Sequence, residues 1–240
     1  MRRYSLFCLP FAGASIFSYR RYVAESPANI NAIPVEIPGR GSRFREEPLK
    51  DLDSIAEDIF RQLESRLHQP YALYGHSMGG LLVHLLTRKI MAKGLEKPSC
   101  IFISGCRGPS FRRAASRYYL LPKQEFITKL REFGGAADEI LNDEKVMEFY
   151  EPVLRSDFQA CDSFVYKEGE LLDIPVIVFY GTEDRVTHEE AAAWQKETRC
   201  GVEIFDLPGA HFFIFSHLPE ILKVISDRLA RIEAAQPIQK

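Results

Sequence analysis

The sequence contains few cysteines, and their arrangement argues against two common uses of that residue. Only five are present among 240 residues, and no two have the spacing of a metal-binding pair. Because their number is odd and their separation wide, we expect reduced, mostly buried thiols in a cytoplasmic protein. The five are Cys8, Cys100, Cys106, Cys161 and Cys200.

Long apolar runs and a surplus of one charge are also absent. No run of eighteen apolar residues occurs, so no membrane-spanning helix is expected. The formal net charge of -2 gives no indication of a nucleic-acid partner. With 46% hydrophobic and 27% charged residues, the chain has an ordinary globular composition. Its length fits a single α/β domain, residues 1–240.

The N-terminus has some features of a secretory signal peptide. Basic residues precede an apolar stretch that ends in the small residues 12–14. However, Pro10 and Gly13 interrupt the stretch, and cleavage there would remove a strand and a loop that the chemistry described below requires. We therefore expect the N-terminus to belong to the folded, cytoplasmic protein.

Short apolar runs alternate with longer amphipathic runs along the chain. This alternation predicts an α/β fold with a mainly parallel sheet and helices on both faces. Asp51 and Asp53 both suit the N-cap of the second helix, and Gly94 suits the C-cap of the third. We expect strands at 4–9, 32–37, 71–74, 100–104, 175–180 and 202–207, and helices at 17–24, 52–67, 80–92, 188–198 and 219–232.

Residues 109–169 break the alternation, because they contain helical patterns and no clear strand. We expect helices there at 122–133, 143–150 and 152–165. A helical insertion between two parallel strands, above their carboxyl ends, would suit a lid over a site. A purely structural helical cap would have the same pattern, so both interpretations stay open.

The motif G-H-S-M-G at 75–79 is the most informative feature of the chain. A short apolar run precedes it and a helical pattern follows it. This strand–turn–helix context is what a nucleophile elbow requires, with glycines where a Cβ would strike its neighbours. Ser77 would stand above the sheet edge at a helix N-terminus, where free N–H groups favour negative charge. Ser77 is therefore the candidate nucleophile.

A serine hydroxyl needs a base to remove its proton, and a third group must orient that base. In the hydrolase order, the acid follows the serine and the histidine follows the acid. Among the six histidines, His211 fits best, because it follows the strand 202–207 through a turn-rich loop. His217 is a distant second choice. Those that fit less well are His68, His76, His84 and His188.

Asp184 is the candidate acid, because it follows the strand 175–180 through a short turn. One strand and one helix fit between Asp184 and His211, so the two loops would lie side by side. An alternative role for Asp184 is to cap the helix that begins near His188. The rival carboxylates are Glu183, Asp157 in the insertion and Asp206 in a strand.

The tetrahedral intermediate of acyl transfer needs two hydrogen-bond donors to its oxyanion. One is the backbone N–H of Met78, the residue after the nucleophile. The other would come from the loop that follows the first strand. We choose Ala12 there, with Phe11 second, because Pro10 has no N–H to donate.

Taken together, these stretches resemble the type II thioesterases, the stand-alone editing hydrolases of nonribosomal peptide and polyketide assembly lines. The resemblance covers nearly the whole chain in order, although Ala14 stands where a second glycine is expected. The matching stretches are L-P-F-A-G at 9–13, E-I-P-G-R-G at 36–41, Y-G-H-S-M-G-G at 74–80, L-R-S-D-F at 154–158, Y-G-T-E-D at 180–184 and P-G-A-H-F at 208–212.

The resemblance implies an α/β-hydrolase fold with a helical lid, a Ser77–Asp184–His211 triad, and oxyanion donors at Ala12 and Met78. It implies hydrolysis of acyl or aminoacyl thioesters on the phosphopantetheine arms of carrier proteins, which clears misprimed or stalled units. No metal or organic cofactor is implied, since the phosphopantetheine belongs to the carrier partner. A monomer is a family-level expectation.

Other interpretations stay open. A small-molecule carboxylesterase or lipase would carry the same triad, and a chain-releasing or cyclising thioesterase would prefer one long acyl product. A non-catalytic binding protein on a hydrolase scaffold would not need all three triad residues. Four phenylalanines could line an acyl pocket or pack the insertion, namely Phe111, Phe133, Phe149 and Phe158. Four arginines could meet an acidic carrier protein or form a solvated surface, namely Arg107, Arg112, Arg113 and Arg117.

Overall fold

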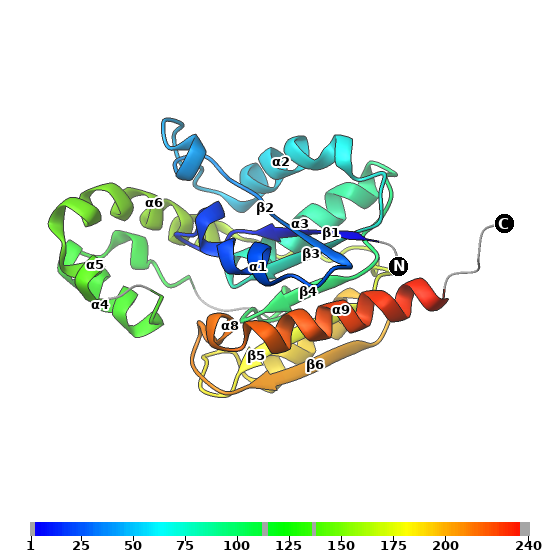
Figure 1. The fold of residues 1–240 in the computed structure, drawn as a ribbon. Helices are drawn as coiled ribbons and strands as arrows, with labels where there is room; N and C mark the ends of the chain where they lie inside the picture. The colour runs from blue at the N-terminus through cyan, green and yellow to red at the C-terminus, as the bar shows by residue number, and fades with distance from the viewer. Residues whose placement is uncertain (1–2, 112–114, 136–137, 236–240) are drawn as a thin grey trace.

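A computed structural model describes residues 3–111, 115–135 and 138–235 (Figure 1). Within these residues a parallel six-stranded sheet has the order β2-β1-β3-β4-β5-β6. The strands are β1 (Tyr4–Leu9), β2 (Ile30–Pro34), β3 (Tyr71–His76), β4 (Ile101–Ser104), β5 (Val176–Gly181) and β6 (Val202–Leu207). The α-helices are α1 (Arg20–Glu25), α2 (Leu52–Leu63), α3 (Met78–Ala92), α4 (Lys123–Phe133), α5 (Asp138–Asn142), α6 (Glu144–Ser163), α7 (His188–Ala192), α8 (Phe213–Ser216) and α9 (Leu218–Ala235).

Helices cover both faces of the sheet, because successive side chains of a strand point to opposite faces. Along β1, Phe7 and Leu9 belong to a core shared with α2 and α3. Leu6 and Cys8 belong to a second core, shared with α1 and α9. In Figure 1, α1 and α9 lie in front of the sheet, and α2 and α3 lie on its other side. Burial on both faces explains the near-continuous apolar character of the strands.

The second strand runs from Ile30 to Pro34, earlier than the 32–37 expected from the apolar pattern. Parallel pairing with β1 runs as far as Pro34, and the next residue, Val35, still donates its N–H to the Cys8 carbonyl at 3.0 Å. Val35 and Ile37 are nevertheless buried in the core beyond the end of the strand. The apolar pattern at 32–37 therefore predicts the burial of these residues correctly, but it places the strand too late in the sequence.

Residues between β4 and β5 form a helical insertion with a small core of its own. Phe126, Leu130 and Met147 lie at the centre of that core. The two helices expected at 143–150 and 152–165 are one helix, α6, which continues through Pro152. A proline inside a helix removes one backbone hydrogen bond without always ending the helix, and here flanking turns continue it. In Figure 1 the insertion lies beside the carboxyl ends of the strands.

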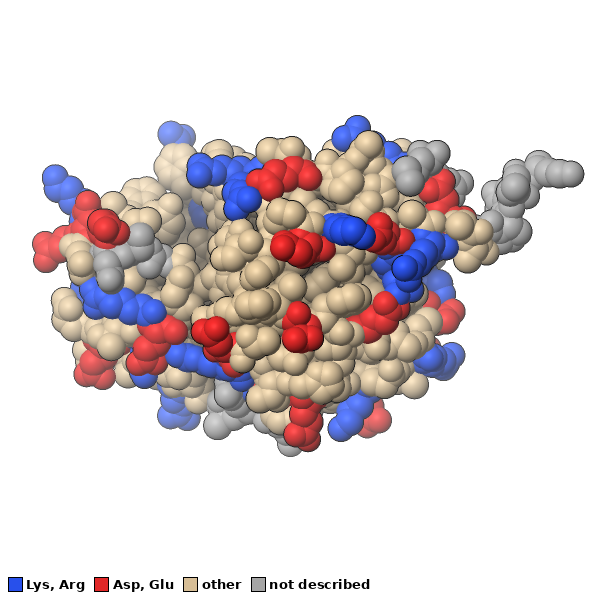
Figure 2. All heavy atoms as spheres, turned by 60° about the horizontal axis from the view of Figure 1, so that its bottom comes forward, with Lys and Arg blue, Asp and Glu red and all other residues tan. Residues whose placement is uncertain are grey.

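The surface carries both signs of charge. Basic and acidic side chains are interspersed over the face in Figure 2. Among the residues that the structure describes, no helix is both long enough and apolar enough to cross a membrane.

Candidate active site

Ser77 lies in a strained turn between β3 and α3. Its φ of 53° and ψ of -117° fall where residues other than glycine are seldom found. A Cβ on Gly75 would lie 2.1 Å from the carbonyl oxygen of Gly79, and a Cβ on Gly79 would lie 2.7 Å from that of Leu9. The Ser77 N–H donates to the Ser104 carbonyl at 2.8 Å, which ties the turn to β4. The glycines of the motif are therefore required by close backbone contacts.

Ser77, His211 and Asp184 form a continuous line of hydrogen bonds, although they come from three separate loops. His211 Nε2 lies 2.9 Å from Ser77 Oγ, and Nδ1 lies 3.0 Å from each oxygen of Asp184. The Asp184 side chain is fully buried, whereas that of His211 remains 13% exposed. A buried carboxylate held against one imidazole nitrogen orients the other nitrogen toward the serine. This arrangement can activate a hydroxyl as a nucleophile.

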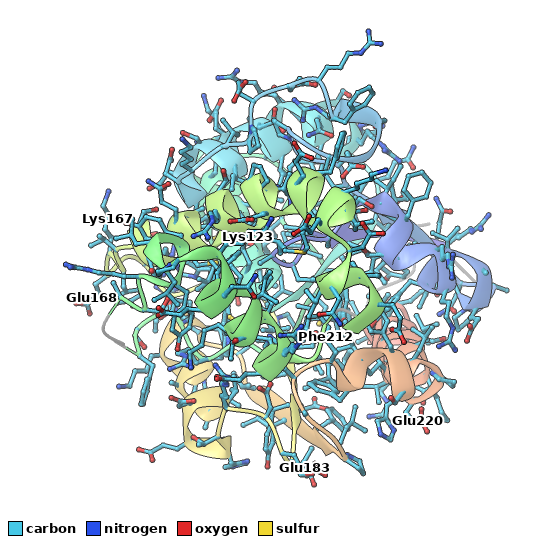
Figure 3. All side chains as sticks on the ribbon, turned by 90° about the vertical axis from the view of Figure 1, so that its left-hand side faces the viewer. Lys123, Lys167, Glu168, Glu183, Phe212 and Glu220 are labelled. Carbon is cyan, nitrogen blue, oxygen red and sulfur yellow. The ribbon has the colours of Figure 1, made fainter. Side chains whose placement is uncertain are left out.

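The rival carboxylates lie elsewhere. Glu183 is exposed and lies at the outer rim in Figure 3. Asp206 is also exposed, and Asp157 is buried against Arg40. Among the other histidines, His217 has its Nδ1 3.9 Å from a carboxylate oxygen of Glu220 and does not line the cavity that Ser77 faces.

His76 packs directly against the candidate base, a contact that the sequence pattern did not indicate. Its ring centroid lies 4.8 Å from that of His211, and its Nδ1 lies 3.1 Å from Ser104 Oγ. Burial, with a smaller effect from His211, holds the pKa of His76 well below its ordinary value. His76 is therefore neutral at physiological pH and adds no charge beneath His211.

Ala12 and Met78 both lie on the cavity that Ser77 faces. In the loop after β1, two other N–H groups already donate hydrogen bonds within the protein. Gly13 donates to Asp157 Oδ2 at 2.7 Å, and Ala14 donates to the Phe11 carbonyl at 2.9 Å. Both bonds favour Ala12 over its C-terminal neighbours as a donor to the cavity.

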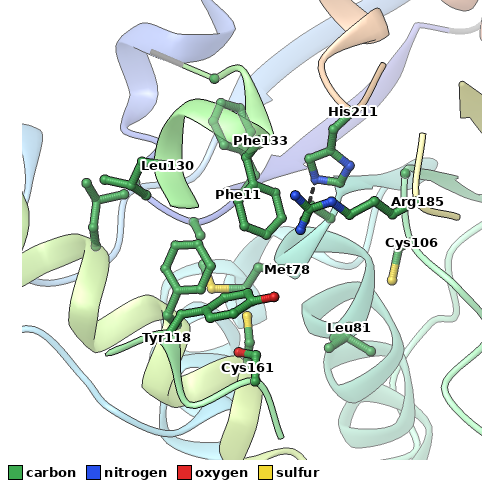
Figure 4. Close-up of a pocket in the computed structure, with 18 of the residues that line it drawn as sticks. Phe11, Met78, Leu81, Cys106, Tyr118, Leu130, Phe133, Cys161, Arg185 and His211 are labelled. Atoms are coloured by element: carbon green, nitrogen blue, oxygen red, sulfur yellow. Dashed lines mark hydrogen bonds between the residues drawn. The ribbon is translucent and has the colours of Figure 1, made fainter. Parts of the chain in front are cut away.

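A cavity of about 1370 Å³ opens beside Ser77 and His211 (Figure 4). Its walls are largely aromatic and aliphatic, and the insertion supplies one side of them. Of the four phenylalanines considered above, Phe111, Phe133 and Phe158 line the cavity, whereas Phe149 is 67% exposed. Phe133 and Phe158 also contact each other, with ring centroids 5.5 Å apart. Phe133 and Phe158 therefore both line the cavity and pack the insertion.

Two cysteines also lie on the cavity wall. Burial raises the pKa of Cys106 to about 12 and that of Cys161 well above its ordinary value. Both thiols are therefore protonated at neutral pH and act as apolar lining, because the thiolate is the nucleophilic form.

Arg185 is a cavity residue that the sequence pattern did not single out, although it directly follows Asp184. Its guanidinium lies 4.3 Å from the centre of the Phe133 ring, beside His211 in Figure 4. Of the arginine cluster, Arg107 pairs with Glu190 at 3.0 Å. Arg112 and Arg113 lie outside the described residues. In the part of the chain that is described, no group of three His, Cys, Asp or Glu side chains could hold a metal ion.

Comparison with known proteins agrees with this geometry. The sequence matches the thioesterase domain family over residues 4–229. It is 33% identical to the gramicidin S biosynthesis protein GrsT of Aneurinibacillus migulanus, over 95% of this chain and 90% of that protein. The structure resembles the type II thioesterase BorB from the borrelidin biosynthetic cluster, with a TM-score of 0.88 and 33% identity over 95% of this chain and 93% of BorB. It also resembles ClbQ from the colibactin pathway, with a TM-score of 0.92 and 26% identity over 98% and 100% of the two chains.

The fold is thus confirmed as the α/β-hydrolase fold, with a mainly parallel sheet and helices on both faces. The chain belongs to the thioesterase family and is a thioester hydrolase. The resemblance to type II thioesterases that the motifs indicated is confirmed as well.

Proposed function

We propose that Ser77, His211 and Asp184 are the catalytic triad of a thioesterase that releases acyl or aminoacyl groups from carrier proteins. The observation that carries this proposal is the hydrogen-bonded line from Asp184 through His211 to Ser77, which opens onto a large apolar cavity. The relatives support this substrate class, because GrsT is a gramicidin S biosynthesis protein, BorB is a type II thioesterase and ClbQ belongs to an NRPS/PKS pathway.

The reaction proceeds in two halves. Ser77 Oγ attacks the thioester carbonyl while His211 Nε2 takes its proton, and the N–H groups of Ala12 and Met78 stabilise the oxyanion. The carbon–sulfur bond then breaks, His211 protonates the departing pantetheine thiol, and an acyl-serine remains. His211 next deprotonates a water molecule that attacks the acyl-serine. Collapse of the second oxyanion releases the carboxylic acid and returns the proton to Ser77.

The helical insertion serves as a lid over the acyl group in this proposal. In support of this role, α4 and α6 contribute apolar side chains to the cavity wall, namely Leu130, Phe133, Leu154 and Phe158. Apolar walls favour the acyl part of the substrate, and they exclude water from the developing oxyanion. The carrier protein would remain outside, with only its pantetheine arm entering.

We further propose that the enzyme works on its carrier partners in the cytoplasm. Its five cysteines are all free thiols, which is typical of proteins from reducing compartments.

The test is release of a short acyl group from a phosphopantetheinylated carrier protein. Ser77→Ala should lower the single-turnover rate by at least about 10³-fold, because the nucleophile is lost. Ser65→Ala is the matched control, since Ser65 is exposed in a short 3-10 helix at Glu64–Arg66. It should hydrolyse the acyl carrier at the wild-type rate.

Parallel turnover of a simple oxygen ester separates the alternatives. Rapid ester turnover with no release from the carrier would favour a small-molecule esterase instead. Undiminished release by Ser77→Ala would refute the proposed triad.

A further inference from the structure

A buried ion pair joins two of the sequence motifs that the triad does not use. Arg40, from the stretch 36–41, donates from Nη1 and Nη2 to the two carboxylate oxygens of Asp157 at 2.6 and 2.7 Å. Asp157 belongs to α6 in the helical insertion. The side chains of Arg40 and Asp157 are only 5% and 0% exposed. The pair therefore links the sheet side of the molecule to the insertion through its interior.

The same two side chains hold the loop that follows β1. The Gly13 N–H donates to Asp157 Oδ2 at 2.7 Å, and Arg40 Nη1 donates to the Ala14 carbonyl at 3.3 Å. Gly13 has a φ of +80°, and a Cβ at this position would lie 2.6 Å from a methyl group of Leu154 on α6. The loop segment next to Ala12 is therefore pressed against α6 and hydrogen-bonded to it.

Stability alone is a weak reason for this pair. Removing two charges from water costs about as much as their attraction returns, and apolar replacements of buried ion pairs are often neutral or stabilising. A bidentate arginine–carboxylate pair does, however, define positions closely, because two parallel hydrogen bonds set both distance and angle. An oxyanion donor depends on such positioning, since its hydrogen bond to the transition state must be preformed.

We propose that Arg40 and Asp157 are positioning residues that hold the Ala12 N–H in register for the oxyanion and join it to α6. This inference rests on the proposed function, in which Ala12 is an oxyanion donor. Asp157 acts on Ala12 through the neighbouring Gly13 N–H, and Arg40 fixes the orientation of the Asp157 carboxylate. Movement of α6 would consequently be transmitted to the oxyanion loop.

The main test removes both charges at once, in the double variant Arg40→Met/Asp157→Leu. This variant removes both members of the pair together, and with them the acceptor of the Gly13 N–H. The buried Glu36 carboxylate loses the nearby Arg40 charge but still accepts from the Ile16 N–H. We expect kcat for thioester hydrolysis to fall by about 10- to 100-fold, as for a misplaced catalytic group, with KM within about twofold. Affinity for an alkylboronic acid, which forms a tetrahedral adduct with Ser77, should fall by the same factor.

A second bidentate arginine–aspartate pair, more exposed than the first, provides the control. Arg43 donates from Nη1 and Nη2 to Asp58 at 2.6 and 2.9 Å, but it does not contact the loop after β1 in the described structure. Arg43→Met/Asp58→Leu should therefore leave kcat and boronic acid affinity unchanged.

Asp157→Asn distinguishes a positioning role of the pair from a purely stabilising one. It also provides the test if the double variant does not fold. It leaves the Arg40 charge buried and unpaired, so the free energy of unfolding should fall. Its amide oxygen can still accept from Gly13, so it should retain more kcat than the apolar double variant. A merely structural pair would instead make activity follow stability, with the less stable variant the less active.

Unchanged kcat and boronic acid affinity in the apolar double variant would overturn the inference, as would a change in KM alone. If the double variant does not fold, loss of boronic acid affinity in folded Asp157→Asn would overturn it. None of these results depends on Ser77→Ala, whose undiminished activity would refute the proposed function itself.

Discussion

At the scale of single residues, the site depends on backbone positions that tolerate no side chain. Ser77 adopts a φ of 53° because the chain must turn sharply from β3 into α3. At Gly75 the backbone of α3 leaves no room for a Cβ, and the strain at Ser77 persists only while this close contact is maintained. The chemistry of the serine is therefore tied to the absence of a methyl group two residues earlier.

Gly75→Ala should disable the enzyme. The added Cβ would lie 2.1 Å from the Gly79 carbonyl oxygen, which is backbone and cannot rotate away. We expect a loss of about 3 kcal/mol or more in the free energy of unfolding, together with loss of thioester hydrolysis. Urea denaturation and acyl release would measure the two effects.

Gly201→Ala is the control for that variant, because no atom beyond the adjacent residues lies within 4 Å of an added Cβ at Gly201. Its stability should stay within about 0.5 kcal/mol of wild type. Equal stability of the two alanine variants would contradict the backbone-contact explanation of the motif.

At the scale of elements, the helix ends are only partly predictable from the sequence. Asp51 and Asp53 are equally good N-cap candidates for α2 by residue type, and the structure selects Asp51. Its φ is -140°, and its carboxylate accepts from the Ser54 N–H at 2.7 Å. Asp53 already lies within the first helical turn. The sequence shows which residue types can cap a helix. Only the local backbone conformation determines which of them is the N-cap.

Asp51→Ala should lower the free energy of unfolding by about 1 kcal/mol, because one N-terminal N–H loses its acceptor. Asp53→Ala removes the same charge from the first turn without breaking the cap, so it should cost about half as much or less. Urea denaturation of the two variants measures the difference. An equal loss in both would mean that charge near the helix terminus, and not the cap, is what stabilises α2.

The longer insertion helix illustrates a different limit of sequence reasoning. Pro152 divides the pattern into two expected helices, yet α6 is continuous from Glu144 to Ser163. The apolar positions on either side of Pro152 pack into the cores of the molecule, and this tertiary packing outweighs one lost hydrogen bond. A sequence pattern near a proline indicates only the local backbone preference. It does not include the tertiary packing that can override that preference.

At the scale of the whole molecule, parallel topology explains why the sequence alone predicts that Asp184 and His211 lie close together. Asp184 and His211 each follow a strand, and the carboxyl ends of parallel strands meet at one edge of the sheet. Adjacency of β5 and β6 then brings the two loops together. The pair of Arg40 and Asp157 had no such signal, because neither residue directly follows a strand of the sheet.

Buried neutral histidines make the whole fold sensitive to acid. His84 on α3 is only 3% exposed, and burial with a smaller effect from Arg88 lowers its pKa to about 3. Glu197 lies 3.6 Å away but is itself paired with Arg88. Because the folded pKa lies below the unfolded value of about 6.5, protons bind preferentially to the unfolded chain. Above pH 6.5 the titration of His84 therefore costs the folded state nothing. As the pH falls from 6.5 toward 3, the free energy of unfolding falls progressively.

His84→Gln should therefore flatten the acid limb of the stability profile. Between pH 5.5 and 4.5 the wild-type free energy of unfolding should fall more steeply than that of the variant, by about 1.4 kcal/mol per pH unit. Carboxylates contribute to both proteins alike, so the difference isolates His84. The comparison requires urea titrations at several pH values, with His68→Gln as a control at an exposed histidine that should keep the wild-type slope. Parallel profiles for wild type and His84→Gln would show that His84 takes up its proton without unfolding the protein.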